Sequence, residues 1–368
     1  MKAIRIGRAA AVLSVAALAL SACGSDNPSG NSGGDTAPKG SNVSGQIKGI
    51  GSSAQKAAMN EWMTQFQNAN SGAKADYSPD GSGAGRKAFI AGGAQFAGTD
   101  SSFKDEELSQ VKKTCPSGII EVPTYVSPIA VTFNLPGVKE LKLDAKTTAK
   151  IMRGEIAKWN DPEIKKQNSG VDLPDTAITP VHRSDESGTT DNFTDYLNKA
   201  GEGAWPEEKA QSWPSSLKGE SAKGTDGVVS TVKGTKGAVG YADESAVGDL
   251  GTVSLKVGSE YVKPSKDGAT KALDAAKPKH EGSKTDLALK LDRKTTEKGA
   301  YPAILASYQV FCSSYKDAKT ADTVKAWAKY VVSEEGQKAA SEAAGSAPIS
   351  SELSKKATEA VEGIKSGK

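Results

Sequence analysis

Apolar and polar positions follow two periods along most of the chain. Short apolar runs typical of strands alternate with stretches whose apolar residues recur at helical spacing. The expected strands are 46–50, 74–77, 95–98, 119–122, 129–133, 178–182, 238–241 and 303–311. The expected helices are 55–68, 86–91, 106–113, 147–152, 191–199, 228–233 and 321–334. This alternation predicts an α/β fold, with helices layered on sheets.

The first 45 residues break this pattern. Three basic side chains and no acidic one lie in the first eight residues, an apolar run covers 9–20, and Leu-Ser-Ala precedes Cys23. A basic start, a short apolar run and a small-residue cleavage site are typical of a secretory signal, and the run is shorter than the ~20 residues of a membrane-spanning helix. The Cys23 context resembles the bacterial lipobox, which predicts cleavage of residues 1–22 and a lipid on Cys23. The alternative is an ordinary signal peptide that contains a cysteine.

The segment from Cys23 to residue 45 is rich in Gly, Ser, Asn and Pro, so it is expected to be a flexible tether. Loss of residues 1–22 would leave 44 basic and 44 acidic residues. A balanced chain argues against a nucleic-acid partner, and any affinity for anions must come from local geometry. About 320 residues follow the tether, enough for two domains.

Polar turns follow four of the expected strands. They are residues 51–54 (Gly-Ser-Ser-Ala), 81–85 (Gly-Ser-Gly-Ala-Gly), 99–100 (Thr-Asp) and 183–189 (Arg-Ser-Asp-Glu-Ser-Gly-Thr). Three of them combine hydroxyls with glycine where a helix is expected to begin. Helix N-termini expose unpaired N–H groups and positive dipole ends, which favours an anion site without a metal. Arg183 adds a planar fork suited to a tetrahedral oxyanion. Taken singly, such a turn is more often a plain N-cap.

The same residues give little support to other functions. Residues 49–54 fit the G-x-G-x-x-G/A dinucleotide pattern with Asp76 downstream, but an exported protein meets little nicotinamide cofactor. Ser187 lacks the flanking glycine of a nucleophile elbow, and His182 more simply ends a strand. No Cys/His cluster in the sequence has metal-ligand spacing. We therefore expect a protein that is not an enzyme and needs no cofactor or metal.

Two cysteines remain beyond Cys23. Cys115 and Cys312 form an even pair, which in an oxidising compartment favours one disulfide. Two buried free thiols are the alternative, because the sequence does not give their separation.

Six segments together resemble the PstS family, the phosphate-binding components of phosphate-specific ABC transporters. They are residues 49–53 (Gly-Ile-Gly-Ser-Ser), 77–85 (Tyr-Ser-Pro-Asp-Gly-Ser-Gly-Ala-Gly), 96–100 (Phe-Ala-Gly-Thr-Asp), 133–137 (Phe-Asn-Leu-Pro-Gly), 158–160 (Lys-Trp-Asn) and 183–189. The likeness runs from about residue 46 to about residue 310.

The resemblance implies a two-domain, type II-like periplasmic-binding-protein fold. Each domain would be a mixed or parallel sheet flanked by helices, with the ligand in the cleft between them. Domain I would comprise 46–125 and about 256–368, and domain II would comprise 126–255. Cys115 and Cys312 would then both lie in domain I.

The resemblance also implies a set of ligand contacts. These are the Ser53 hydroxyl, the Ala54 backbone N–H, Ser82, Asp100, Arg183, Ser187, Gly188 and Thr189, with Asp185 orienting Arg183. Two positions depart from the family: Ser53 stands where Thr is frequent, and Ala54 where a bulky aromatic is common, so the cleft wall would be more open.

Asp100 is the informative member of this set. A carboxylate repels anions, but it can accept the proton that hydrogen phosphate keeps and sulfate lacks. The N-terminal residues predict a lipid-anchored, extracytoplasmic protein, and the resemblance implies a monomer that captures inorganic phosphate for an ABC permease and its ATPase. Capture of another oxyanion such as arsenate, and an exported phosphatase, remain alternatives.

Overall fold

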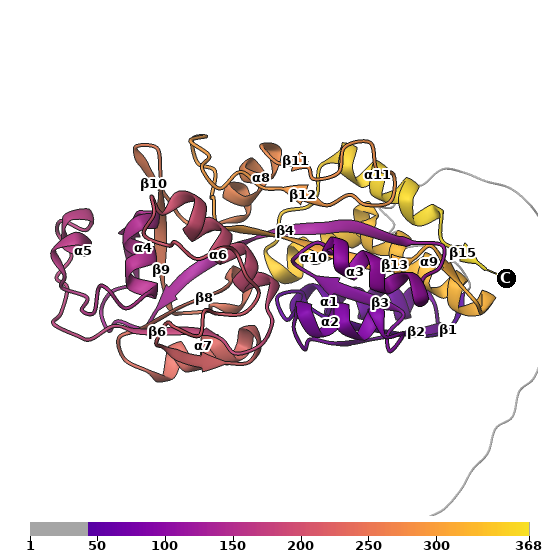
Figure 1. Ribbon diagram of the computed structural model, residues 1–368, viewed down its shortest axis with the longest axis horizontal. Helices are drawn as coiled ribbons and strands as arrows, with labels where there is room; N and C mark the ends of the chain where they lie inside the picture. Colours follow the sequence, from indigo (N-terminus) through magenta and orange to yellow (C-terminus); the bar gives the residue numbers. More distant parts are fainter. Residues whose placement is uncertain (1–42, 368) are drawn as a thin grey trace, which may run out of the picture. The chain divides into compact units, whose positions relative to one another are not determined.

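A computed structural model describes residues 43–367. Within this part of the chain, one mixed sheet of 11 strands contains the order β2-β1-β3-β13-β4-β8-β6-β7, and β9, β5 and β10 extend it beside β4. Its bounds are β1 Ser44–Gly51, β2 Gly72–Ser78, β3 Phe96–Thr99, β4 Ile119–Phe133, β5 Glu140–Leu143, β6 Thr179–Arg183, β7 Glu220–Ala222, β8 Ala238–Asp243, β9 Gly251–Val257, β10 Glu260–Val262 and β13 Ile304–Cys312. Figure 1 shows helices around this sheet, as expected for an α/β fold.

Strand β4 is continuous through a stretch that the sequence divides into two strands, 119–122 and 129–133. It pairs with β13 over its first part and with β8 from Ile129 onward, so one strand links both parts of the sheet (Figure 1). The expected break was wrong, because Pro123 and Pro128 both pair with β13 inside one continuous strand. The strand contains a β-bulge: Pro123 pairs with Tyr308 and Tyr125 with Ser307, so Thr124 is an extra residue of β4.

Most helices begin near their expected positions. The principal ones are α1 Lys56–Ala69, α2 Ser82–Ile90, α3 Asp105–Gln110, α4 Ala145–Met152, α5 Pro162–Gln167, α6 Gly188–Ala200, α7 Gly224–Gly234, α8 Lys266–Asp274, α9 Ala318–Val332, α10 Glu334–Ala344 and α11 Ser351–Glu362. The expected helix 321–334 ends earlier, because Ser333 leaves the helical conformation and caps α10 through a bond from the Gly336 N–H. None of the helices in the described part has the length and apolar character needed to cross a membrane.

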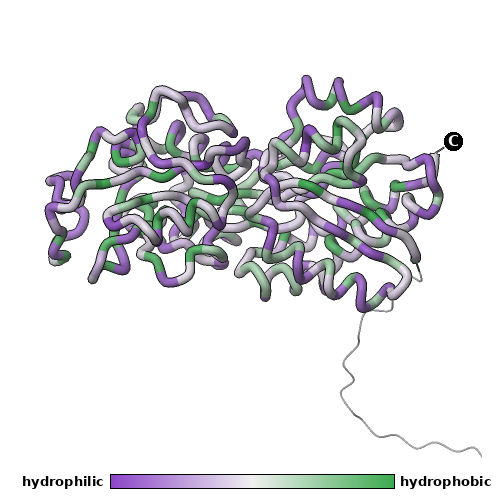
Figure 2. Tube along the Cα trace, turned by 90° about the horizontal axis from the view of Figure 1, so that it is seen from below, coloured by the Kyte–Doolittle hydropathy of each residue, from purple (hydrophilic) through white to green (hydrophobic). Residues whose placement is uncertain are grey.

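Aromatic side chains fill the core on both sides of β4. Trp327 of α9 packs edge-on against Phe66 of α1, with ring centroids 5.4 Å apart, and also against Phe96 of β3. Farther along β4, Phe133 packs on Trp159. Figure 2 shows hydrophobic and hydrophilic positions interspersed along most segments, as expected for elements with one buried face.

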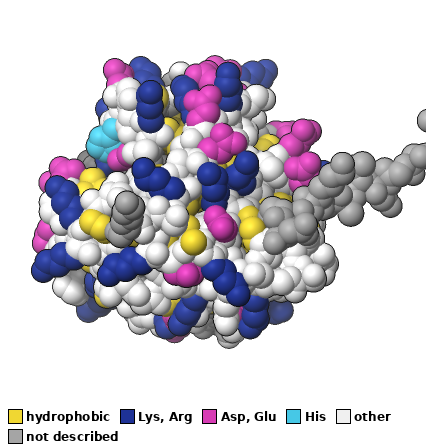
Figure 3. Space-filling model, turned by 90° about the vertical axis from the view of Figure 1, so that its right-hand side faces the viewer, with side chains coloured by type: hydrophobic (Ala, Val, Ile, Leu, Met, Phe, Trp, Pro, Cys, Tyr) yellow, Lys and Arg dark blue, Asp and Glu magenta, His cyan; other side chains and the backbone are white. Residues whose placement is uncertain are grey.

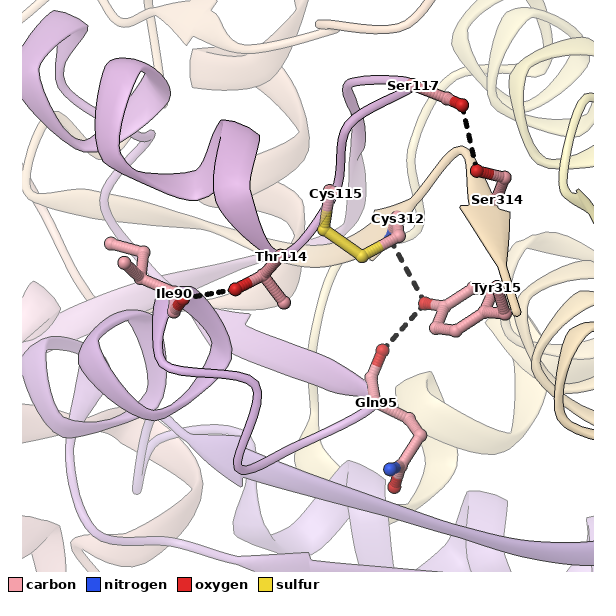
Figure 4. Close-up of a disulfide and its surroundings, with 8 residues drawn as sticks. All are labelled: Ile90, Gln95, Thr114, Cys115, Ser117, Cys312, Ser314 and Tyr315. Atoms are coloured by element: carbon pink, nitrogen blue, oxygen red, sulfur yellow. Dashed lines mark hydrogen bonds between the residues drawn. A yellow bond between two sulfur atoms is a disulfide. The ribbon is translucent and has the colours of Figure 1, made fainter. Parts of the chain in front are cut away.

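A disulfide joins Cys115 to Cys312, with their Cα atoms 5.1 Å apart (Figure 4). This is the pairing that the sequence favoured. Beside it, the Tyr315 hydroxyl donates to the Gln95 carbonyl and accepts from the Cys312 N–H. The bond therefore connects the approach to β4 with the end of β13. The predicted signal peptide 1–22 and the lipid site Cys23 lie outside the described residues.

Candidate functional site

All eight predicted ligand residues are buried and lie along one interface, where turns from both parts of the sheet meet. Strands β1, β2 and β3 run parallel, so the turns that follow them lie at one edge of the sheet. Arg183 ends β6 and Gly188 begins α6. A Cβ placed on Gly188 would lie 2.6 Å from Ser82 Oγ and 2.7 Å from Asp100 Cβ. Only a glycine at position 188 permits this approach.

Asp100 lies at the centre of this interface and is 2% exposed. Its two carboxylate oxygens accept from the Ser52 hydroxyl at 2.5 Å and the Ser307 hydroxyl at 2.6 Å, and its N–H donates to Ser82 Oγ. Burial raises the pKa of Asp100, while the two serine hydroxyls and the charge of Arg183 act in the opposite direction. Each carboxylate oxygen can accept more than one hydrogen bond.

Arg183 is held by Asp185 in a fork. Its Nε and Nη2 donate to the two carboxylate oxygens of Asp185 at 2.7 and 2.5 Å. Burial acts to raise the pKa of Asp185, but the bonds and charge of Arg183 outweigh it and hold the pKa below its usual value. The N–H of Gly224 donates to the same carboxylate. This orienting contact is the role that the resemblance implied for Asp185.

The N-terminus of α6 presents the remaining polar groups. Ser187 is the N-cap, and its hydroxyl accepts from the Thr190 N–H at 3.2 Å. The capping role leaves the Ser187 hydroxyl proton free to be donated. The Thr189 hydroxyl is buried, and no partner for it exists among residues 43–367. A buried hydroxyl without a partner is costly, so this position favours a bound polar group.

The turn after β1 contacts α7 across the same interface. The Ser53 hydroxyl lies 3.0 Å from the Thr225 hydroxyl and accepts from the Thr225 N–H. The Ala54 N–H, expected among the ligand donors, donates to Ser52 Oγ at 3.1 Å. The turn 99–100 differs from the other three, since α3 begins only at Asp105 and Asp100 is not its cap.

Charged side chains also bridge the interface at its surface. Lys56 pairs with Asp226 at 2.5 Å, Lys87 with Glu186 at 2.7 Å, and Lys223 with Asp80 at 2.9 Å. These pairs are largely exposed, so each contributes little to stability. They show, however, that the two sides of the interface are in contact. The hydrogen bonds of Ser53 and the close approach of Gly188 show the same, so the interface is closed in this structure.

The sequence reasoning missed several supporting residues. Asn192 donates to the carbonyls of Asp100 and Gly188, and its own Oδ1 accepts from Arg293. Arg86 is buried and donates to the side chains of Glu107 and Gln211. The backbone carbonyl of Gln211 accepts from the Ser187 N–H. Asn192 lies four positions after Gly188, so the two residues share one face of the helix. This spacing is the feature of the sequence that could have pointed to Asn192.

The alternative functions can be set against the structure. His182 stacks on Trp213 with ring centroids 5.1 Å apart, a packing role at the end of β6. The described residues contain no cluster of His, Cys, Asp or Glu able to hold a metal ion. The residues brought together are hydroxyls, an arginine, a helix N-terminus and one carboxylate.

Comparison with known proteins shows the family of the chain. Residues 36–335 match the family described as PBP superfamily domain. The phosphate-binding protein PstS 3 of Mycobacterium leprae is 37% identical over 335 residues, covering 89% of this chain and 90% of the relative. The chain belongs to the PstS family. A PstS relative from Haemophilus influenzae is 33% identical and covers 80% of the chain and 86% of its own length.

Solved structures of phosphate-binding proteins share the fold. A high affinity periplasmic phosphate-binding protein (PfluDING), bound with phosphate, matches with a TM-score of 0.68 at 19% identity, covering 84% of this chain and 92% of that one. A putative phosphate ABC transporter substrate-binding protein from Clostridium perfringens matches with a TM-score of 0.61, covering 83% and 100%. The fold is therefore the two-domain periplasmic-binding-protein fold that the sequence predicted.

Proposed function

We propose that this protein captures inorganic phosphate outside the cytoplasm and delivers it to an ABC importer. The observation that carries the proposal is the N-terminus of α6: Gly188 closely approaches the buried Asp100, and the same turn carries Arg183 and the unpartnered Thr189 hydroxyl. A helix N-terminus with an oriented guanidinium suits a tetrahedral oxyanion. Relatives and neighbours named as phosphate-binding proteins support phosphate as that anion.

Asp100 selects the protonation state of the ligand. Ser52 and Ser307 hold its carboxylate in one orientation, which leaves acceptor positions for a proton donated by hydrogen phosphate. Fully ionised sulfate offers only lone pairs to this carboxylate. A buried acceptor facing another acceptor loses about 1–3 kcal/mol or more, enough for strong discrimination.

The closed interface supports capture by domain closure. Domain I comprises 46–125 and about 256–368, domain II comprises 126–255, and β4 crosses between them near Tyr125. Phosphate binds to residues of both domains and shifts the population toward the closed form, which presents a complete surface to the permease. The protein works as a monomer, held at the membrane by a lipid on Cys23. Its role is binding without catalysis.

A calorimetric titration of the purified protein tests this function. Phosphate is expected to bind with one site per chain, arsenate to bind as well because it keeps a proton, and sulfate to bind far more weakly. Equal affinity for sulfate and phosphate contradicts the role of Asp100. Release of phosphate from a chromogenic ester contradicts the non-catalytic role, and a Cys23→Ser variant that stays with the membrane contradicts the lipid anchor.

A further inference from the structure

A lysine-lined cavity adjoins the phosphate site on the side of Asp100. It has a volume of about 220 Å³. Its wall includes Asp100 and Asn192 of the site, and also Ser101, which follows Asp100 in the sequence. Its basic side chains come from three separate segments of the chain and are Lys199, Lys209, Lys279, Lys290 and Arg293. Because Asp100 belongs to both the cavity wall and the site, an anion in this cavity would lie next to the proposed phosphate position.

These cations are only partly neutralised. Asp195 pairs with Lys199 at 2.7 Å and with Arg293, and Lys209 lies 3.6 Å from Asp191. Lys279 donates to the Ser102 hydroxyl, a neutral partner. Lys290 makes no ion pair with any residue of the described chain.

Two further cavities extend the basic surface from Lys199 and Arg293. One adds Lys146, Lys256 and Lys294, and the other adds Lys277. Across the three cavities, nine basic residues stand against six acidic ones. This local excess belongs to a chain whose predicted mature form has 44 residues of each sign. By contrast, basic and acidic side chains are interspersed on the face shown in Figure 3.

The rest of the interface is arranged differently. Where α1, α2 and the start of α7 meet, each surface lysine is matched by an acid across the interface, as in Lys56–Asp226 and Lys87–Glu186. In Figure 1 these helices lie along the lower edge of the molecule, whereas β11 (Lys277–Pro278) and β12 (Leu289–Lys290), which carry lysines of the cavity, lie along the upper edge. One edge is closed by ion pairs, and the other keeps unmatched positive charge.

We propose that the lysine-lined cavity is an approach site that receives inorganic phosphate dianions from solution before they reach Asp100 and Arg183. The inference rests on the proposed phosphate-binding function. An excess of positive charge around a cleft raises the local concentration of anions and accelerates their association. The buried carboxylate of Asp100 makes such a device useful, since it repels a dianion that must pass close to it. Exposed lysines act on the approach of the ligand and leave its final contacts unchanged.

Stopped-flow measurement of phosphate association tests the approach site. The variant K209Q/K279Q/K290Q removes three charges from the cavity wall. The matched control K112Q/K113Q/K355Q removes three exposed lysines that line none of these cavities. At low salt we expect the cavity variant to lose about 5- to 10-fold in association rate with less than about 2-fold change in dissociation rate, while the control changes less than about 2-fold. The charge-retaining K209R/K279R/K290R variant should keep the wild-type rate.

Salt adds a second readout. The wild-type association rate should fall steeply with ionic strength, and that of the cavity variant should fall much less. Equal rates for the cavity and control variants would overturn the approach site, as would a faster dissociation at unchanged association. If wild-type protein shows no phosphate binding by calorimetry, the proposed function fails and the approach site fails with it; normal equilibrium binding with unaltered rates refutes the approach site alone.

Discussion

The two sides of the proposed phosphate site differ in whether their polar groups already have hydrogen-bond partners. On the side of β1–β3, the polar groups are already engaged: Asp100 accepts from Ser52 and Ser307, and Ser53 contacts Thr225. On the side of α6, Thr189 keeps an unpartnered hydroxyl. The engaged side fixes one carboxylate in a single orientation, and the α6 side offers donors and positive charge.

This difference separates attraction from selection. Donors and a guanidinium attract any tetrahedral oxyanion, while a rigid acceptor admits only an anion that still carries a proton. Damage to the α6 side should therefore weaken all oxyanions together. Damage to the Asp100 side should change the ratio between them.

The largest effect is expected from Arg183→Ala. The change removes the guanidinium and leaves Asp185 without its partner beside the ligand. Phosphate affinity should fall at least about 1,000-fold, equivalent to about 4 kcal/mol. Titration calorimetry measures this loss, and arsenate should lose affinity in parallel. A variant that keeps affinity within 10-fold of wild type would place the anion elsewhere.

Asp100→Asn tests whether this side of the site selects phosphate over sulfate. The amide replaces one acceptor by a donor, so the proton of hydrogen phosphate loses its partner and sulfate gains one. We expect about 100-fold weaker phosphate binding and a phosphate-to-sulfate ratio close to unity, from a loss of about 3 kcal/mol at a buried, charged hydrogen bond. Competition of sulfate against labelled phosphate gives the ratio. An unchanged ratio would show that selection lies outside Asp100.

Gly188→Ala tests the contact between the two sides. Its Cβ would overlap Ser82 and Asp100 in the closed interface, while the backbone of Gly188, at the start of α6, suits alanine. Overpacking of this kind costs about 2 kcal/mol, or about 30-fold in phosphate affinity, with little change in melting temperature without ligand. Gly234→Ala, with open space at its Cβ position, is the control. Small-angle scattering should show compaction on adding phosphate only in the control and wild type.

Thr189→Val removes the unpartnered hydroxyl at nearly constant volume. Phosphate affinity should fall about 10-fold, the value of one hydrogen bond to a charged ligand, and stability without ligand should stay equal or rise. Thr190→Val is the contrasting variant, because the Thr190 hydroxyl already bonds to Tyr241 at 2.6 Å. It should lose stability more than affinity. A Thr189→Val protein that binds normally would exclude this hydroxyl as a contact.

Asp243 is a second buried acid, and unlike Asp100 it is expected to affect stability and not ligand binding. Burial raises its pKa to about 7, with hydroxyl and backbone bonds from Ser245 acting against the rise. Between pH 4 and pH 7 the folded state thus holds a proton that the unfolded state has lost, so this group lowers stability as pH rises. Relative to wild type, Asp243→Asn should gain on the order of 2 kcal/mol in stability between pH 5 and pH 8. Urea unfolding at both pH values checks this, and phosphate affinity should not change.

The sequence predicts the parts of the site that are local. The turn 183–189 carries its own arginine, cap and helix start, so pattern and resemblance both find it. Ser307 and Asn192 were missed because their roles depend on packing across more than 90 residues of chain. The continuity of β4 through Pro123 and Pro128 was missed for the same reason: both prolines pair with β13, nearly 200 residues downstream.

The disulfide sets an order of assembly. Cys115 and Cys312 are 197 residues apart, and β13, which ends at Cys312, lies between β3 and β4 in the sheet. The bond can therefore form only after the chain has been synthesised as far as Cys312. Until then β3 and β4 lack the strand that joins them, while β5–β9 are contiguous in sequence. Once formed, the bond lowers the entropy of the unfolded chain and stabilises the fold by about 5 kcal/mol in the chain-entropy model. Late formation of the disulfide therefore stabilises a sheet whose neighbouring strands come from distant parts of the chain.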